Sequence, residues 1–296
     1  MTNQDGRTSS RQPDDAAPTG RAMPSLVSFF VLAYAASWTC WLAAEKISSE
    51  TQPPLPAMGA LRSTLLLAGA FGPALAALVL TSRAGGRRGL YALLARMFQG
   101  RVDLWWYLFA ILYMPAIKLA VALTHHLASG IWPRFGHEGP LLITTAILLS
   151  LPVQSGEELG WRGYALPRLA SYFGWPFASV LLGAVWALWH LPLFFVPGAD
   201  KYGQSFLVYA IGTIAFSVAI AWVYARTNGS LLLTMLMHSA FDQTIGIVSD
   251  VLAPGEKPFA LGASLPFVLT IAFMWIVAAY LLVKMRTLGP PRLQVV

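Results

Sequence analysis

The sequence predicts an all-α protein, a polytopic bundle of about eight transmembrane helices. Three observations support this fold class. Of the 296 residues, 56% are hydrophobic and only 11% are charged, whereas soluble domains carry about 25% charged residues. The mean hydropathy is +0.60. The apolar residues also fall in long runs, and roughly 20 apolar residues are needed to cross the hydrocarbon of a bilayer.

Eight apolar runs are candidate spans. They cover residues 24–44, 58–82, 104–124, 140–157, 175–196, 205–225, 229–249 and 264–284. The first run is too long for a typical signal peptide, and the fourth loses its apolar character at Gln154. We therefore expect three parts: a disordered cytoplasmic tail at 1–23, a transmembrane domain at 24–286, and a cytoplasmic tail at 287–296.

The basic residues support this count and give an orientation. With the N-terminus inside, 14 of the 20 Lys and Arg residues fall in cytoplasmic segments and four fall outside. This bias follows the positive-inside rule and predicts eight spans with both termini in the cytoplasm. We expect the protein in the plasma membrane. The net charge of +7 could suggest nucleic acid, but the basic residues flank apolar runs. We expect them to contact lipid headgroups and expect no nucleic-acid partner.

The loop at residues 83–101 predicts a short amphipathic helix in the cytoplasmic interface. Its apolar side chains fall at helical spacing among arginines. They are Leu90, Leu93, Leu94, Met97 and Phe98. A basic loop that only sets the topology would fit the same residues.

Ionisable residues occur inside the predicted bilayer region at three places, although each costs roughly 2.5–3.5 kcal/mol on insertion scales. The first place is the end of the fourth span. On a helix, Glu158 and Arg162 lie one turn apart and can pair. Glu157 is rotated by about 100° and stays free for chemistry. The alternative is a charge cluster that only ends the helix.

The second and third places contain histidines. Trp186 lies one turn before His190 in the fifth span, and Pro192 should kink the helix there and leave a polar pocket. His238 and Asp242 lie one turn apart in the seventh span. Each place alone could be a packing feature. One shared site explains all three places together and therefore gives the stronger interpretation.

These residues resemble the three motifs of the CAAX-protease and bacteriocin-processing (CPBP) intramembrane proteases, which include prenyl-protein endopeptidases of the Rce1 type. The first motif is Glu157-Glu158 followed by Arg162, the second is Trp186 followed by His190, and the third is His238 followed by Asp242. The matched core covers about residues 150–245. The resemblance implies an endopeptidase that acts on a membrane-anchored peptide or protein, either CAAX-like or of the leader or bacteriocin type.

The resemblance also implies roles for the site residues. Glu157 and His190 would activate a water molecule, and their buried carboxylate and imidazole suit acid–base work. His238 and the residue at 242 would stabilise the oxyanion. Glu158, Arg162 and Trp186 would support them. This hypothesis requires Glu157, His190 and His238 to line a single water-accessible cavity.

Two positions depart from the family pattern. Trp186 stands where the family often has Phe, and it keeps an aromatic ring. Asp242 stands where Asn is common, and an ionised Asp cannot donate a hydrogen bond. Asp242 could be kept protonated by its apolar surroundings, it could orient His238, or it could ligate a metal.

A zinc cofactor is an open alternative, because the family is often labelled metalloprotease. Glu157, His190, His238 and Asp242 could together bind zinc. The His-Glu-x-x-His motif is absent, since His137-Glu138 is followed by Leu141, and Cys40 as the single cysteine excludes a Cys-based site. We favour a metal-independent glutamate mechanism.

Two other functions fit the same residues. Buried Glu, His and Asp can relay protons in a proton- or ion-coupled transporter. A catalytically silent immunity or scaffold protein could share the fold without the chemistry.

Overall fold

The computed structural model describes residues 22–50, 56–248, 259 and 264–291. Within this part the chain folds into nine α-helices, joined by short 3₁₀ turns and one π turn, so the all-α prediction is confirmed. The helices are α1 (Ala22–Glu50), α2 (Pro56–Gly69), α3 (Gly72–Ala95), α4 (Leu104–Ser129), α5 (Pro140–Gly160), α6 (Leu166–Trp189), α7 (Phe206–Arg226), α8 (Leu231–Thr244) and α9 (Leu265–Met285).

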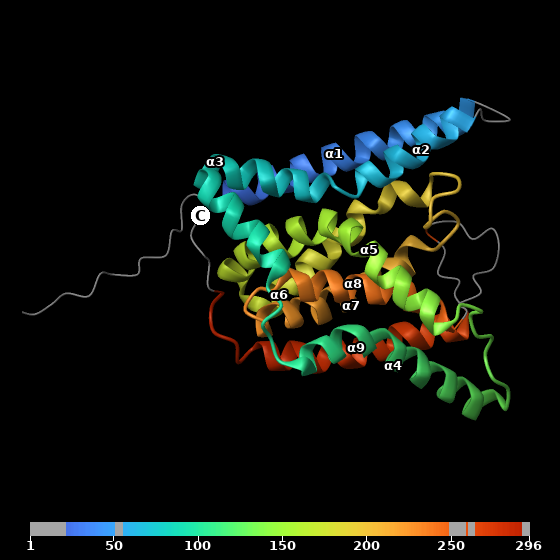
Figure 1. The fold of residues 1–296 in the computed structure, drawn as a ribbon. Coiled ribbons are helices and arrows are strands. Elements are labelled where there is room, and N and C mark those ends of the chain that lie inside the picture. The colour runs from blue at the N-terminus through green and yellow to red at the C-terminus, as the bar shows by residue number, and fades with distance from the viewer. Residues whose placement is uncertain (1–21, 51–55, 249–258, 260–263, 292–296) are drawn as a thin grey trace, which may run out of the picture.

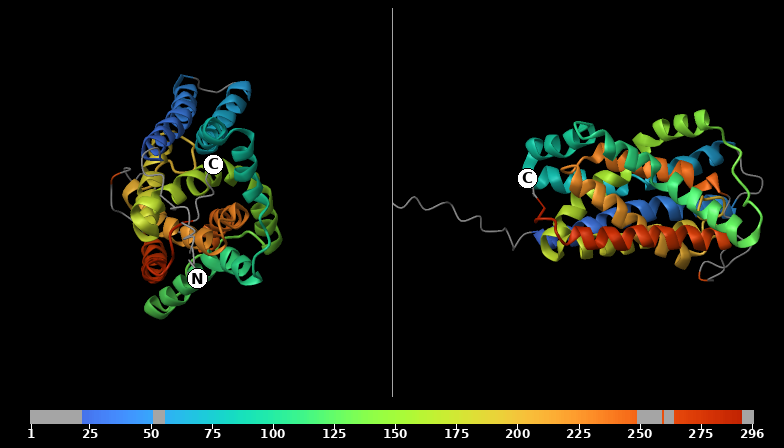
Figure 2. Two further views of the ribbon diagram at one scale, coloured as in Figure 1. Left: turned by 90° about the vertical axis from the view of Figure 1, so that its left-hand side faces the viewer. Right: turned by 90° about the horizontal axis from the view of Figure 1, so that it is seen from below.

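The helices form a bundle whose centre carries the three motifs. Figure 1 shows α1, α2 and α3 along one side, α4 and α9 along the other, and α5 to α8 between them. Helix α8 packs against α4, α5 and α7, and α6 packs against α7. The end-on view in Figure 2 shows the same layering. The motif helices α5 and α8 are therefore in direct contact, and α6 is joined to them through α7 and the π turn Trp161–Ala165.

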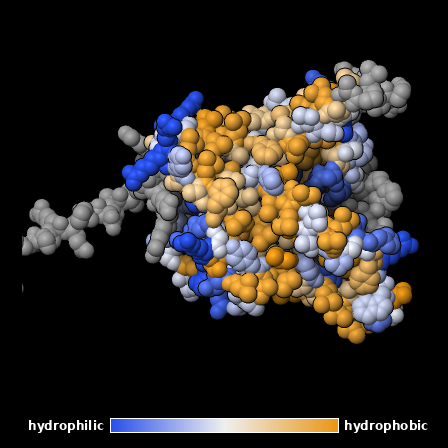
Figure 3. Space-filling model, in the orientation of Figure 1, coloured by the Kyte–Doolittle hydropathy of each residue, from blue (hydrophilic) through white to orange (hydrophobic). Residues whose placement is uncertain are grey.

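The outer surface of the bundle is apolar. In Figure 3 the hydrophobic residues cover most of the visible face, and the hydrophilic residues gather mainly towards its two ends. Leu149 is 74% exposed and Ile276 is 64% exposed on the helix surfaces. Contiguous apolar surface of this kind is a site of membrane contact. It agrees with a multi-pass membrane protein.

The predicted count of eight spans is not confirmed. In the described residues, five helical segments are long and apolar enough to cross a membrane, and a sixth is added if α2 and α3, bent by 50°, form one span. Two of the predicted spans lie in one segment of 50 residues, Pro140–Trp189, which Gly174 interrupts with a φ of 74°. Another predicted span is α8, which has only 14 residues.

The two described ends of the chain agree with an even number of crossings. Helix α1 begins and α9 ends on the same side of the bundle in Figure 1. The side of the membrane on which they lie stays a prediction, as does the plasma membrane itself. The predicted tails fall mostly outside the described residues, because the description begins at residue 22 and ends at residue 291.

The predicted helix after residue 83 is present as the second half of α3. Gly86 has non-helical angles with φ 55°, which only glycine adopts easily, and it divides α3 into two helical parts. In the second part Leu93 is buried, and Arg87 and Arg88 are exposed. This short helix is amphipathic, and its position at a membrane surface stays a prediction.

Candidate active site

Glu158 and Arg162 form a fully buried ion pair at the end of α5. Arg162 Nη1 donates to Glu158 Oε1 over 2.8 Å, and both side chains are 0% exposed. Arg162 lies in the π turn Trp161–Ala165 that continues α5, and its guanidinium stands over the ring of Trp186 at 4.2 Å. The pairing predicted from the four-residue spacing is present in the structure. Glu158 is thus neutralised within its own helix.

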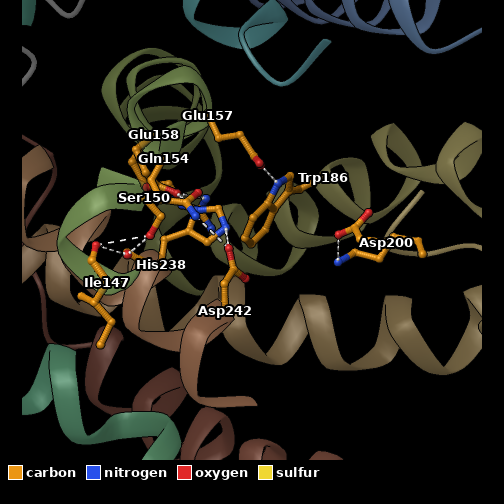
Figure 4. A network of polar contacts seen from close by, with 12 residues as sticks. Ile147, Ser150, Gln154, Glu157, Glu158, Trp186, Asp200, His238 and Asp242 are labelled. Carbon is orange, nitrogen blue, oxygen red and sulfur yellow. Dashed lines mark hydrogen bonds and ion pairs between the residues drawn. The ribbon is translucent and has the colours of Figure 1, made fainter. Parts of the chain in front are cut away.

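His238 on α8 is the second partner of Glu158. Its Nδ1 lies 2.9 Å from Glu158 Oε1, and because a carboxylate only accepts, Nδ1 carries the hydrogen. Its other nitrogen, Nε2, lies 3.7 Å from Asp242 Oδ2, which is longer than a hydrogen bond. Asp242 Oδ2 instead accepts a hydrogen bond of 2.8 Å from Gln154 Nε2. Figure 4 shows these side chains meeting between α5 and α8.

Glu157 points away from this network, as Figure 4 shows. Its Oε2 accepts a hydrogen bond of 2.6 Å from Trp186 Nε1. The edge of the same Trp186 ring meets His238, with the ring centroids 5.1 Å apart. The two adjacent glutamates therefore have different partners. Glu158 binds Arg162 and His238, and Glu157 accepts a hydrogen bond from Trp186 outside that ion-pair network.

His190 stands at the end of α6, which stops at Trp189. In place of the kink predicted at Pro192, the structure ends the helix and continues with the 3₁₀ turn Leu191–Phe194. Proline supplies no N–H to continue the helix, and its ring fits the start of a new turn. His190 Nδ1 lies 2.9 Å from the carbonyl oxygen of Trp186. That carbonyl accepts, so Nδ1 carries the hydrogen and Nε2 keeps its lone pair.

Glu157 and His190 line one pocket of about 300 Å³ between α1, α2, α5 and α6. Most of its wall is apolar or aromatic, and Asp200 also lines it. The lining residues are Trp41, Leu66, Leu67, Ala70, Glu157, Trp189, His190, Leu193, Gly198, Ala199 and Asp200. His238 and Asp242 do not line this pocket. The predicted cavity therefore contains Glu157 and His190 but not His238. His238 instead contacts the ring of Trp186.

The four candidate zinc ligands do not converge on a point. Among the described residues, no group of three or more His, Cys, Asp and Glu side chains is arranged to hold a metal ion. The Nδ1 atom of His238 donates to Glu158, and Glu157 Oε2 accepts from Trp186. A zinc site needs three or four such donors around one ion. The arrangement of these side chains does not fit a zinc site.

Sequence reasoning missed three polar contributions to the site. In the sequence Gln154 only indicates the polar end of a span, yet its side chain donates a hydrogen bond to Asp242. Ser239 Oγ donates to the carbonyl of Ile147 over 2.6 Å and also bonds Ser150. These contacts join α5 to α8. Serines in apolar helices give no sequence signal for such a role, since they equally well bond within their own helix.

Two comparisons with known proteins gave a match. A family model described as "Type II CAAX prenyl endopeptidase Rce1-like" matches residues 138–244, which include all three motifs. The curated "CAAX prenyl protease 2" of Methanococcus maripaludis is 32% identical over 137 residues, covering 43% of this chain and 51% of that protein. The chain thus matches about half the length of this relative. The family model agrees over residues 138–244 with the resemblance to the CPBP family, and the relative is named as a protease of the same type.

Proposed function

We propose that this protein is an intramembrane endopeptidase that hydrolyses a peptide bond of a membrane-associated substrate with a water activated by Glu157 and His190. One observation supports this proposal most strongly. Glu157 and His190 line the same pocket, whereas the neighbouring Glu158 is taken up by Arg162 and His238. A carboxylate and an imidazole on one cavity can share a water between them.

The two residues would divide the work on the water. His190 Nε2 accepts one hydrogen of the water and orients it, because Nδ1–H is held by the carbonyl of Trp186. Glu157 accepts the other proton as the water oxygen bonds to the carbonyl carbon. The carbonyl electrons move to its oxygen. Glu157 then returns the proton to the amide nitrogen as the C–N bond breaks, which gives a carboxylic acid and a free amine.

His238 is the proposed oxyanion donor, although it does not line the pocket of Glu157 and His190. The proposal therefore requires a bound substrate whose carbonyl oxygen reaches past the ring of Trp186, which His238 contacts. His238 stands between two carboxylates, with Glu158 at 2.9 Å and Asp242 at 3.7 Å, and the proposal places a hydrogen on Nε2 as well as on Nδ1. In that form Nε2–H can donate to the developing oxyanion. Of the three expected arrangements for Asp242, this proposal uses the one in which it supports His238.

The pocket wall supports a substrate that is apolar near the cleaved bond. Leu66 and Leu67 of α2 line the pocket together with Leu193 and with Ala70, the residue after α2. An apolar wall binds apolar side chains by excluding water. A prenylated CAAX peptide is the first probe to use, because the relative is named for that substrate. A leader-type peptide with a hydrophobic segment is the second.

The test is cleavage of these two peptides, each made with a fluorophore and quencher, by the purified full chain in liposomes. We expect Glu157→Gln and His190→Ala to lower kcat by about 10²- to 10⁴-fold. Glu138→Gln is the matched control, because Glu138 is exposed in a loop, and it should cleave like the wild type. Unchanged turnover in Glu157→Gln ends the proposal, and proton-linked flux without cleavage supports a transporter.

The same assay tests the metal question. Turnover with and without 1,10-phenanthroline should agree, because the proposed mechanism uses only the side chains of the chain itself. Loss of turnover with the chelator, followed by recovery when zinc is added, would overturn the metal-free mechanism and would leave the endopeptidase proposal standing.

A further inference from the structure

Gln154 is a buried polar side chain that the mechanism above does not use. It is 5% exposed, and it lies on α5 one turn before Glu157 and Glu158. A buried amide in a membrane helix is costly unless it is hydrogen-bonded. Its Nε2 donates to Asp242 Oδ2 on α8 over 2.8 Å. The contact is a charge-assisted hydrogen bond between two of the three motif helices.

Asp242 creates a difficulty for the proposed oxyanion site. Its carboxylate side chain is 40% exposed and its Oδ2 lies 3.7 Å from His238 Nε2. A movement of about 1 Å would bring Oδ2 within the usual range, about 2.7–3.2 Å, of an N–H···O bond. Asp242 would then take the N–H of His238 that can reach an oxyanion, because Nδ1–H is already given to Glu158.

The geometry points to Gln154 as a positioning residue that holds Asp242 Oδ2 away from His238 Nε2 and so keeps this N–H free for the oxyanion. The inference rests on the proposed function. At 3.7 Å the carboxylate still favours the charged imidazole by attraction, but it does not occupy the donor. The hydrogen bond from Gln154 also partly compensates the negative charge of Asp242, which lowers the repulsion between this carboxylate and an oxyanion.

This role predicts that the need for Gln154 depends on the residue at 242. An Asn at this position has no negative charge, and its own amide can donate to the oxyanion. In the Asp242→Asn background, Gln154 should therefore matter little. In the wild-type background, loss of the Gln154 donor would let Asp242 take the Nε2–H of His238, and the hydrogen bond from His238 to the oxyanion would be lost. Because that hydrogen bond forms only in the transition state, kcat should fall and KM should stay almost unchanged.

The experiment measures kcat and KM on the quenched prenylated peptide in liposomes for four variants of the full chain. Gln154→Met keeps the side-chain length and removes only the donor, and we expect kcat to fall about 10- to 100-fold with KM within about threefold. In the Asp242→Asn background, adding Gln154→Met should change kcat by less than about threefold relative to Asp242→Asn alone. Gln243→Met is the matched control next to Asp242, and it should have no effect.

Several outcomes would overturn the inference. Wild-type kcat in Gln154→Met would do so. An equal loss in the wild-type and Asp242→Asn backgrounds would show a plain packing role, as would failure to fold in both backgrounds in a thermal unfolding measurement. Glu157→Gln distinguishes failure of the Gln154 role from failure of the endopeptidase proposal. If Glu157→Gln is inactive while Gln154→Met is normal, only the role of Gln154 fails; if Glu157→Gln cleaves normally, the endopeptidase proposal fails.

Discussion

Replacing Arg162 with Leu should destabilise the protein strongly, because the change leaves a buried carboxylate without its main partner. The two charges of the Glu158–Arg162 pair are 2.8 Å apart and both side chains are 0% exposed. At an effective dielectric constant of about 20, their attraction is about 6 kcal/mol. Much of it is offset by the cost of removing both charges from water. Removing one partner alone typically costs about 3–5 kcal/mol.

Two structural details adjust this value in opposite directions. The Arg162→Leu variant would also lose the contact of the guanidinium with Trp186 at 4.2 Å, which is worth up to about 2 kcal/mol when desolvated. His238 Nδ1–H still donates to Glu158 at 2.9 Å, and it would carry part of the compensation. We therefore expect Arg162→Leu to lower the free energy of unfolding by about 3–5 kcal/mol.

The measurement is reversible unfolding of the purified protein in mixed micelles with added denaturing detergent, followed by tryptophan fluorescence. Arg83→Leu is the matched control, because Arg83 is exposed on α3, and it should change the free energy by less than about 0.5 kcal/mol. The double variant Glu158→Gln/Arg162→Leu should lose less than Arg162→Leu, because Gln leaves no buried charge. The reasoning is refuted if Arg162→Leu unfolds at the wild-type detergent fraction.

Two further predictions concern single contacts. Trp186→Phe keeps an aromatic ring but removes the N–H group that donates a 2.6 Å hydrogen bond to Glu157. We expect kcat on the quenched peptide to fall less than about tenfold, because water in the pocket can replace the donor. A loss of kcat as large as that of Glu157→Gln would contradict this prediction. Gly160→Ala places a Cβ 2.4 Å from Pro73 Cβ, and this overpacking of α3 against α5 should lower the free energy of unfolding by about 1–3 kcal/mol. Gly139→Ala is the control, because nothing lies within 4 Å of a Cβ there. Equal free energies of unfolding for the two variants would refute the contact.

The helices of the bundle were predictable because hydropathy is a local property of the chain. Each of the eight apolar runs overlaps a helix. The number of spans was less predictable. Hydropathy cannot distinguish a lipid-facing helix from one enclosed by other helices, and α8 is apolar because it is buried among α4, α5 and α7. With 14 residues it is shorter than the roughly 20 that cross the hydrocarbon unaided.

Within the site, the contacts that could be predicted are those inside one helix. A four-residue spacing places Glu158 beside Arg162, because successive turns of a helix stack. The contacts that could not be predicted cross between helices. Gln154 and Asp242 are 88 positions apart, and Glu157 and Trp186 are 29 apart. Their meeting depends on the rotation of each helix about its axis, which the packing of the whole bundle sets.

The pair of adjacent glutamates shows how one helix can place one carboxylate in an ion pair and the next at a pocket. Neighbouring residues on a helix point about 100° apart, so Glu158 enters the ion-pair network with Arg162 while Glu157 reaches the pocket. The ion pair thus occupies Glu158 and leaves Glu157 at the pocket, where the proposed mechanism uses it as the base.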